Sequence, residues 1–159
     1  MACAALALTL IACSSEKKEE STPAPAETTT EKETETEAET TGKKEMHLYI
    51  NGEEIPVTWE DNAAVSEMME AVSVSDIEIA MEKYGGFEQV GSLGRSFTSN
   101  DERITTVCGD IMLYNDSNIV LFYGSNTWEY TRLGVINLPE DEIENLLSND
   151  AVELLLKVN

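Results

Sequence analysis

Positive charge is scarce in this sequence. The 159 residues include 10 Lys and Arg against 31 Asp and Glu, and the formal net charge is -21 at pH 7. The cations within residues 46–159 are Lys83, Arg95, Arg103, Arg132 and Lys157. Nucleic-acid binding draws on clusters of Lys and Arg that neutralise phosphates, and such clusters are missing here. The composition therefore argues against nucleic acid as a partner and indicates an acidic, self-repelling surface.

Residue types that bind metals or act as nucleophiles are also few. His47 is the one histidine, and the cysteines are Cys3, Cys13 and Cys108. The sequence has no His and Cys cluster with zinc spacing, no calcium loop, no Gly-x-Ser-x-Gly and no phosphate-binding loop. Cys108 lies far in sequence from His47, so we interpret it as a small buried hydrophobe. We expect no metal, no cofactor and no catalytic residue.

The chain opens with a short apolar run. Residues 4–11 have the length of the apolar region of an export signal and are too short to cross a bilayer of roughly 30 Å. The run ends at Leu10-Ile11-Ala12-Cys13, which resembles the bacterial lipobox, although no Lys or Arg precedes it. By that resemblance residues 1–13 are a lipoprotein-type signal segment and Cys13 is acylated. We expect an extracytoplasmic protein that is anchored to membrane lipid.

Residues 14–45 form a segment rich in Glu and Thr. They contain no aromatic residue and no Val, Ile, Leu or Met. Nothing in the segment can be buried to offset the cost of ordering the backbone, so it is predicted to be a disordered linker. Its root-mean-square span is roughly 30 Å, and repulsion between Glu residues extends it further.

Residues 46–159 carry the hydrophobic pattern of a folded domain. Residues 46–59 alternate around Asn51-Gly52 and predict a hairpin, in which Pro56 indicates an edge strand or a bulge. Asp61 or Asn62 can cap a helix whose apolar stripe is Val65, Met68, Met69 and Val72.

The remaining pattern predicts further strands and one more helix. The expected strands are residues 77–82, two strands around the turn 115–118, residues 127–136 and residues 152–158, with Ile111, Leu113, Val120 and Phe122 available to the interior. A helix is expected after Pro139, with acidic residues in its first turn. Many short strands with two brief helices predict a mainly β protein, a small closed barrel that we expect to be monomeric.

One stretch, YGGFEQVGSLGR at residues 84–95, has neither helical nor strand periodicity. Each glycine costs roughly 0.5 to 1 kcal/mol relative to Ala inside a regular element. We interpret the stretch as a rigid loop in which Gly85, Gly86, Gly91 and Gly94 adopt positive φ. Such a loop would hold Phe87, Leu93 and Arg95 beside an opening of the barrel.

Several segments, in order, are similar to those of the bacterial cyclophilin-like domain family, which is distinct from the true cyclophilins. The segments are LYINGEEIPVTWEDN, YGGFEQVGSLGRS, NDERITT, GDIMLY and IVLFYGSNTWEYTRLG. The resemblance runs from about Met46 to Val158 and implies a cyclophilin-type β-barrel with helices capping its ends.

Two groups of side chains are candidates for ligand binding. The first is Phe87 and Arg95 at the glycine stretch. The second is Tyr123, Asn126, Trp128, Tyr130 and Arg132, in which Trp128, Tyr130 and Arg132 share one strand face and suit an anion clamp or a cation stacked on a ring. The alternative is structural: the arginines pair with nearby carboxylates and the aromatic rings fill the core.

Two functions are compatible with this pattern. The first is a non-catalytic binding module for a small molecule or an extended peptide. The alternative is a divergent peptidyl-prolyl isomerase, in which Arg95 would polarise the proline amide. The Phe-His-Arg and Gln-Gly-Gly-Asp stretches of true cyclophilins are missing from this sequence, which favours the first function.

Overall fold

The computed structural model describes residues 44–159. The predicted signal segment with Cys13, and residues 14–43 of the predicted linker, lie outside the described residues. Lys44 and Glu45 are exposed and lead into the first strand without regular structure. Within residues 44–159, no helix combines the length and the apolar content that a membrane span requires.

The described part is mainly β, as predicted, with two helices. The elements in chain order are β1 Met46–Ile50, β2 Glu53–Ile55, β3 Val57–Trp59, α1 Ala63–Val74, β4 Ile77–Tyr84, β5 Glu88–Ser92, β6 Glu102–Thr105, β7 Asp110–Tyr114, β8 Asn118–Phe122, β9 Thr127–Ile136, α2 Glu140–Leu147 and β10 Val152–Val158.

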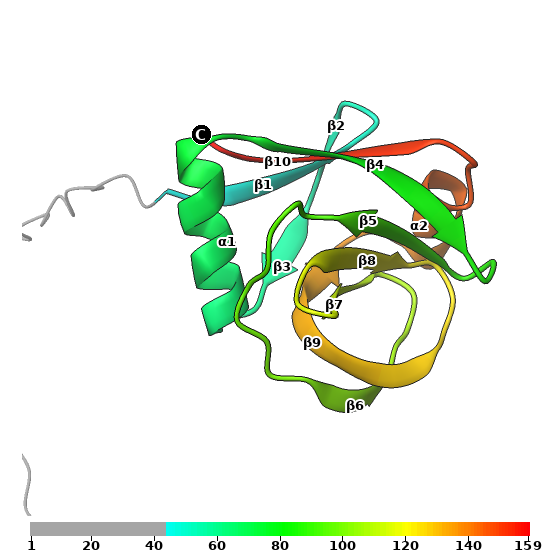
Figure 1. Cartoon of the computed structure of the whole chain (residues 1–159). Helices are drawn as coiled ribbons and strands as arrows, with labels where there is room; N and C mark the ends of the chain where they lie inside the picture. Colours follow the sequence, from blue (N-terminus) through cyan, green and yellow to red (C-terminus); the bar gives the residue numbers. More distant parts are fainter. Residues whose placement is uncertain (1–43) are drawn as a thin grey trace, which may run out of the picture. The chain divides into compact units, whose positions relative to one another are not determined.

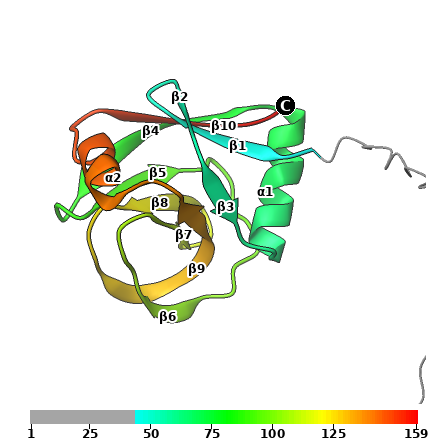
Figure 2. The same cartoon turned by 180° about the vertical axis from the view of Figure 1, so that it is seen from behind.

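The strands form one antiparallel sheet that curls into a nearly closed barrel, and this confirms the predicted fold class (Figure 1). The strand order is β2-β1-β10-β4-β5-β8-β7-β9-β3, and β6 pairs with the first half of β9. The end strands β2 and β3 are separated in sequence by Pro56 alone. The chain thus changes partner at a residue that cannot donate a ladder hydrogen bond, passing from β1 to β9. This short segment links the two ends of the sheet (Figure 2).

Local sequence determines the first tight turn and the start of α1. Asn51 and Gly52 have φ values of 52° and 85°, as the predicted hairpin turn requires. Asn62 caps α1, because its Oδ1 accepts a hydrogen bond from the backbone N–H of Val65 at 3.0 Å. Its amide Nδ2 also donates to the carbonyl of Arg132 at 2.8 Å, which fixes the helix start against β9.

Two hydrophobic clusters fill the domain, where the sequence pattern indicated one interior. Strands β7 and β8 are buried on both faces and divide their side chains between the clusters. Ile111 and Leu113 enter the larger cluster, beside β1, β10, β4 and the helices. Val120 and Phe122 enter a smaller one, which lies against the opposite face of the same strands. The larger cluster is the barrel core, and the smaller one is a second, separate hydrophobic cluster.

The glycine-containing stretch is not one loop, and that prediction was wrong. Gly85 and Gly86 have positive φ in the turn after β4, and Gly94 has positive φ beyond β5. Gly91 does not have positive φ; it lies inside β5. A Cβ at Gly91 would lie 2.4 Å from Ile79 Cγ2 and 2.5 Å from Met81 Sδ. Glycine is therefore required there by close packing on the neighbouring strand.

Gly91→Ala should destabilise the domain by about 1–3 kcal/mol, because the added methyl group collides with the side chains of Ile79 and Met81. Urea denaturation measures the change. Glu78→Ala, at an exposed position of the neighbouring strand β4, is the control and should change stability by less than about 0.5 kcal/mol. Equal stability of the two variants would contradict the packing assignment.

The crossover from β5 to β6, residues 93–101, is held by hydrogen bonds along its length. Thr98 donates from both its backbone N–H and its hydroxyl to the Glu67 carboxylate of α1, at 2.8 and 2.6 Å. These bonds lower the pKa of Glu67. Further bonds run from Leu93 N to Ser117 O, from Phe97 N to Asp116 O and from Asn100 N to Thr131 Oγ1. These hydrogen bonds hold the crossover in a fixed shape between α1, the β7–β8 turn and β9.

Candidate functional site

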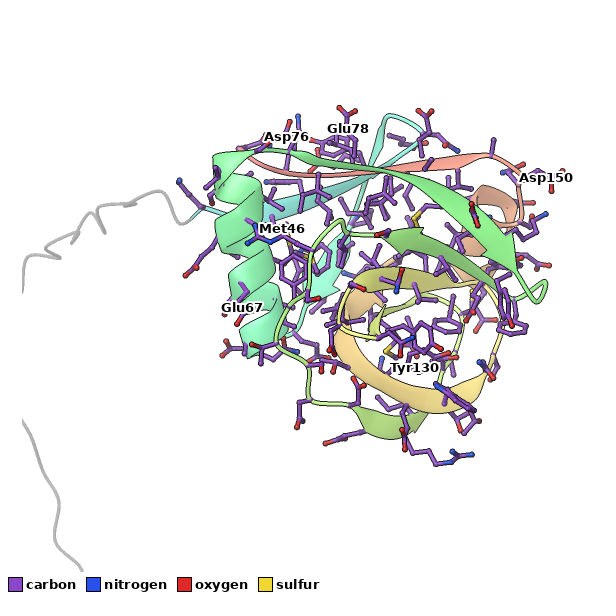
Figure 3. The ribbon with its side chains drawn as sticks, viewed as in Figure 1. Met46, Glu67, Asp76, Glu78, Tyr130 and Asp150 are labelled. Atoms are coloured by element: carbon purple, nitrogen blue, oxygen red, sulfur yellow. The ribbon has the colours of Figure 1, made fainter. Side chains whose placement is uncertain are left out.

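A cavity lies against the smaller hydrophobic cluster, inside the curl of β7, β8 and β9. Figure 3 shows Tyr130 within this curl. The cavity has a volume of about 500 Å³ and receives side chains from β4, β5, β7, β8 and β9. Its lining residues are Glu82, Lys83, Tyr84, Glu88, Val90, Tyr114, Asn118, Val120, Asn126, Trp128 and Tyr130.

Glu88 is the chemically distinctive member of the lining. Strand pairing places it opposite Tyr84 on β4 and Phe122 on β8, so its side chain lies on the face of the smaller cluster. The residue is 5% exposed, and within residues 44–159 its Oε2 has no hydrogen-bond partner. Desolvation by burial raises the pKa of Glu88 to about 7. A buried carboxyl that titrates near neutrality marks a candidate binding site.

Tyr130 forms the base of the cavity. Its ring packs edge-on against Tyr114 at 5.9 Å and Phe122 at 5.6 Å between centroids. Its hydroxyl accepts a hydrogen bond of 3.1 Å from Nδ2 of Asn126. Burial, and secondarily the negative charge of Glu88, raise the pKa of Tyr130. The phenol therefore stays protonated and keeps an O–H to donate.

Trp128 adds apolar surface at the edge of the cavity. It pairs with Ile104 of β6 and is 52% exposed, although it belongs to the cavity lining. An exposed indole at a concave site is available to a ligand. The wall therefore combines a buried phenol, an accessible indole and the buried carboxyl of Glu88.

Arg132 lies in a separate, smaller cavity of about 260 Å³ that shares Tyr130 with the first. Its guanidinium Nη1 donates to Oδ1 of Asp110, which is buried at the start of β7. The other oxygen of Asp110 accepts the backbone N–H of Val107 at 2.9 Å. Arg132 thus neutralises a buried carboxylate, which supports the structural alternative over an anion clamp.

Arg95 lies elsewhere on the surface. Its guanidinium carbon is 5.7 Å from the ring centroid of Phe97, in a cavity of about 300 Å³ that Glu67 and Glu70 also line. The two arginines therefore do not face one opening.

Of the other residues predicted from the sequence, some line the Glu88 cavity and some pack in the hydrophobic clusters. Asn126, Trp128 and Tyr130 line the cavity. Phe87 packs beside the smaller cluster, and its carbonyl accepts the backbone N–H groups of Tyr123 and Gly124. Tyr123 packs against the larger cluster, with a buried hydroxyl that has no partner within residues 44–159. The structure thus brings three of the seven candidates together.

Glu88, Tyr114 and Asn118 line the cavity but were not predicted. Once residues 88–92 are recognised as a strand, Glu88 and Val90 share one face and Gln89 and Gly91 the other. That alternation is the signal that could have found Glu88. The neighbouring glycines concealed it, because they favoured a loop.

Cys108 lacks the environment of a reactive thiol. Burial is the main cause of a raised pKa for its thiol, and the negative charges of Glu140, Glu144 and Asp110 raise this pKa further. A raised pKa reduces the thiolate fraction, which agrees with the interpretation of Cys108 as a packing residue.

Comparison with known proteins decides the family. A family model described as the cyclophilin-like family matches residues 48–157. The chain belongs to the cyclophilin-like family. The match spans β1 to β10, so the cyclophilin-like domain includes both hydrophobic clusters and the Glu88 cavity.

Other similarities to this cyclophilin-like chain are sparse. No curated protein matches it. One solved structure, of McbB in complex with tryptophan, aligns with a TM-score of 0.46 and 11% sequence identity. The alignment covers 71% of this chain and 44% of the McbB chain, so the chain spans less than half the length of that protein.

Proposed function

We propose that this protein is a non-catalytic binding module, tethered through Cys13 to the outer side of a membrane. Its ligand is a small molecule, or one group of an extended peptide, that enters the cavity lined by Glu88, Trp128 and Tyr130. The observation that carries the proposal is a cavity of about 500 Å³ with aromatic walls and one buried, unpartnered carboxyl oxygen. Ligand pockets commonly combine this volume with apolar walls and a few polar groups.

Other cavities of the described part support binding less well. A cavity of about 880 Å³ lies between the first three strands and α1. Its indole, Trp59, already donates to the carbonyl of Met46 at 2.7 Å, and His47 contacts Glu54 at 2.7 Å. The indole and the imidazole of that cavity already have partners, whereas Oε2 of Glu88 lacks one.

Fragment mapping by heteronuclear NMR tests the binding proposal. Aromatic amines, aromatic acids and neutral aromatic alcohols are added separately to the isotope-labelled full chain. At least one class should shift the amide resonances of Glu88, Val120 and Trp128 and leave those of Arg95 and Ser96 unchanged. Shifts confined to the cavity beside Trp59, or none for any class, would refute the assignment.

The isomerase alternative has weaker support, because Arg95 lies outside the Glu88 cavity and Arg132 is paired with Asp110. The protein should therefore leave prolyl isomerisation at the rate seen in buffer, as measured in a protease-coupled assay with proline-containing peptides. A true cyclophilin in the same assay is the positive control. A rate enhancement that Arg95→Ala abolishes would restore the enzyme hypothesis.

Anchoring depends on the thiol of Cys13 and is tested in cells. Growth with a labelled fatty acid should label the protein, and Cys13→Ala should eliminate the label because the acceptor thiol is gone. Cys108→Ala, which removes a half-buried thiol from the folded domain, is the matched control and should retain full labelling. Label that persists in Cys13→Ala would contradict acylation at this residue.

A further inference from the structure

We propose that the Glu88 cavity is specific for a positively charged ammonium group attached to an apolar body. Glu88 would receive the ammonium, and the rings of Trp128 and Tyr130 would contact it and the adjoining carbon atoms. This inference rests on the proposed function and adds the chemical class of the ligand.

The first observation is the missing partner of Glu88. Within residues 44–159, the buried carboxyl of Asp110 is paired with Arg132 and the N–H of Val107. Glu88 is buried to a similar extent, yet no donor reaches its Oε2. Burying a carboxyl without a partner is costly, so a donor supplied from outside the chain would remove a penalty that the folded domain carries.

The second observation is the charge of the lining. The cavity contains two carboxyl side chains, Glu82 and Glu88, and one cation, Lys83. Lys83 is engaged by Asp150, with 2.7 Å between Nζ and Oδ1, and this pairing raises the pKa of Lys83. An anionic ligand would therefore meet uncompensated negative charge, whereas a cation would complement it.

The third observation is the arrangement of aromatic rings. Tyr84, Tyr114, Trp128 and Tyr130 all line the cavity. Cations bind favourably to the faces of Trp and Tyr, and more strongly where water is excluded. Carboxylate and rings together provide charge and contact area for a substituted ammonium.

The pH dependence of binding follows from Glu88. The titratable or charged groups that line the same cavity are Glu82, Lys83 and Tyr84 from β4, Tyr114 from β7 and Tyr130 from β9. Glu88 has a pKa of about 7 in the free protein, so it is mostly neutral at pH 5 and must lose its proton before it can pair with a cation. Affinity for an ammonium ion should therefore rise with pH and level off above about 7.

Isothermal titration of the full chain tests the proposal with three probes of similar size. Phenethylammonium is the cation, 2-phenylethanol its neutral analogue and phenylacetate the anion, each titrated to about 10 mM because such small ligands bind weakly. We expect phenethylammonium to bind at least about tenfold more tightly than the alcohol at pH 8, and phenylacetate not to bind. The affinity of phenethylammonium should be about tenfold lower, or more, at pH 5 than at pH 8, because a carboxyl with a pKa of about 7 is about 1% ionised at pH 5 and a neutral Glu88 gives the ammonium no advantage over the alcohol.

Variants identify the responsible residue. Glu88→Gln should remove the preference for the ammonium over the alcohol, and Glu78→Gln, at an exposed position on β4, should leave the preference intact. Nα-acetyl-lysine amide, compared with phenethylammonium, distinguishes a peptide lysine from a free aromatic amine as the source of the cation.

Two outcomes are decisive against the proposal. If the alcohol or phenylacetate binds in the cavity as tightly as the ammonium, ammonium specificity fails and the binding module stands. If none of the probes, nor any NMR fragment, enters the cavity, both proposals fail.

Discussion

Glu88→Gln should stabilise the domain by roughly 3 kcal/mol at pH 8 and leave its stability almost unchanged at pH 4. The carboxyl of Glu88 has a pKa of about 7 in the folded protein against an ordinary value of 4.5, because burial disfavours its charged form. At pH values between 4.5 and about 7, the folded state binds more protons than the unfolded state, so the free energy of unfolding falls as pH rises. Above about pH 7 the folded domain carries the full cost of burying the ionised carboxylate, and the neutral amide of Gln, which has a similar shape, removes this cost.

Urea denaturation of the wild type and the variant at pH 4 and pH 8 measures this difference. Glu78→Gln is again the matched control, because it makes the same chemical change at an exposed position on β4. A Glu88→Gln variant that is less stable than the wild type at pH 8 would show that the charged carboxyl has a stabilising partner. The stabilisation expected here is typical of binding sites, where a group kept for function lowers stability.

Arg132→Met should destabilise the domain by about 3–5 kcal/mol at pH 7. Asp110, which Arg132 neutralises, has a 2% exposed side chain and would be left as an uncompensated buried charge. The double variant Arg132→Met with Asp110→Asn should recover much of the loss, because the charge that needs a partner is also removed.

Chemical denaturation of the two single variants and the double variant gives the coupling between the residues. Arg103→Met, at an exposed position of β6, is the matched control and should change stability by less than about 0.5 kcal/mol. If Arg132→Met leaves stability unchanged and abolishes fragment binding, Arg132 contacts ligand and the structural role is wrong.

Features that depend on neighbouring residues could be predicted from the sequence. Asn51-Gly52 specifies the first hairpin turn and Asn62 caps α1, because both act on backbone groups within a few positions. Pro56 was expected at a sheet edge and lies between the two end strands. The barrel itself was expected from the resemblance to the cyclophilin-like family, which the family match confirms.

Features that depend on strand register could not be predicted in this way. Arg132 and Asp110 are 22 positions apart, and their pairing follows from the alignment of β9 with β7. That alignment shifts by one residue between Ile111 and Met112. Periodicity in a single strand indicates which side chains share a face, but not which partner strand lies beside them.

The sequence did not predict the Glu88 cavity, because the glycines of residues 84–95 concealed the strand alternation of residues 88–92. Gly85, Gly86, Gly91 and Gly94 favoured a loop, whereas β5 forms because neighbours on β4 and β8 pair with it. Gly91 is required by Ile79 and Met81 on β4, which lie beyond the reach of local propensity on the partner strand. Tertiary packing therefore overrode the local propensity of this stretch, and with it the expected environment of Glu88.

A carbon-13 NMR titration of the side-chain carboxyl of Glu88, with and without phenethylammonium, measures both the burial of the carboxyl and its pairing with the ion. In the free protein we expect a midpoint near pH 7, because the carboxyl is buried without a partner. With the ammonium ion bound we expect a lower midpoint, because the ion stabilises the carboxylate. A midpoint near 4.5 in the free protein, or one that the ammonium ion leaves unchanged, would show that Glu88 is not the ammonium-binding carboxyl proposed here.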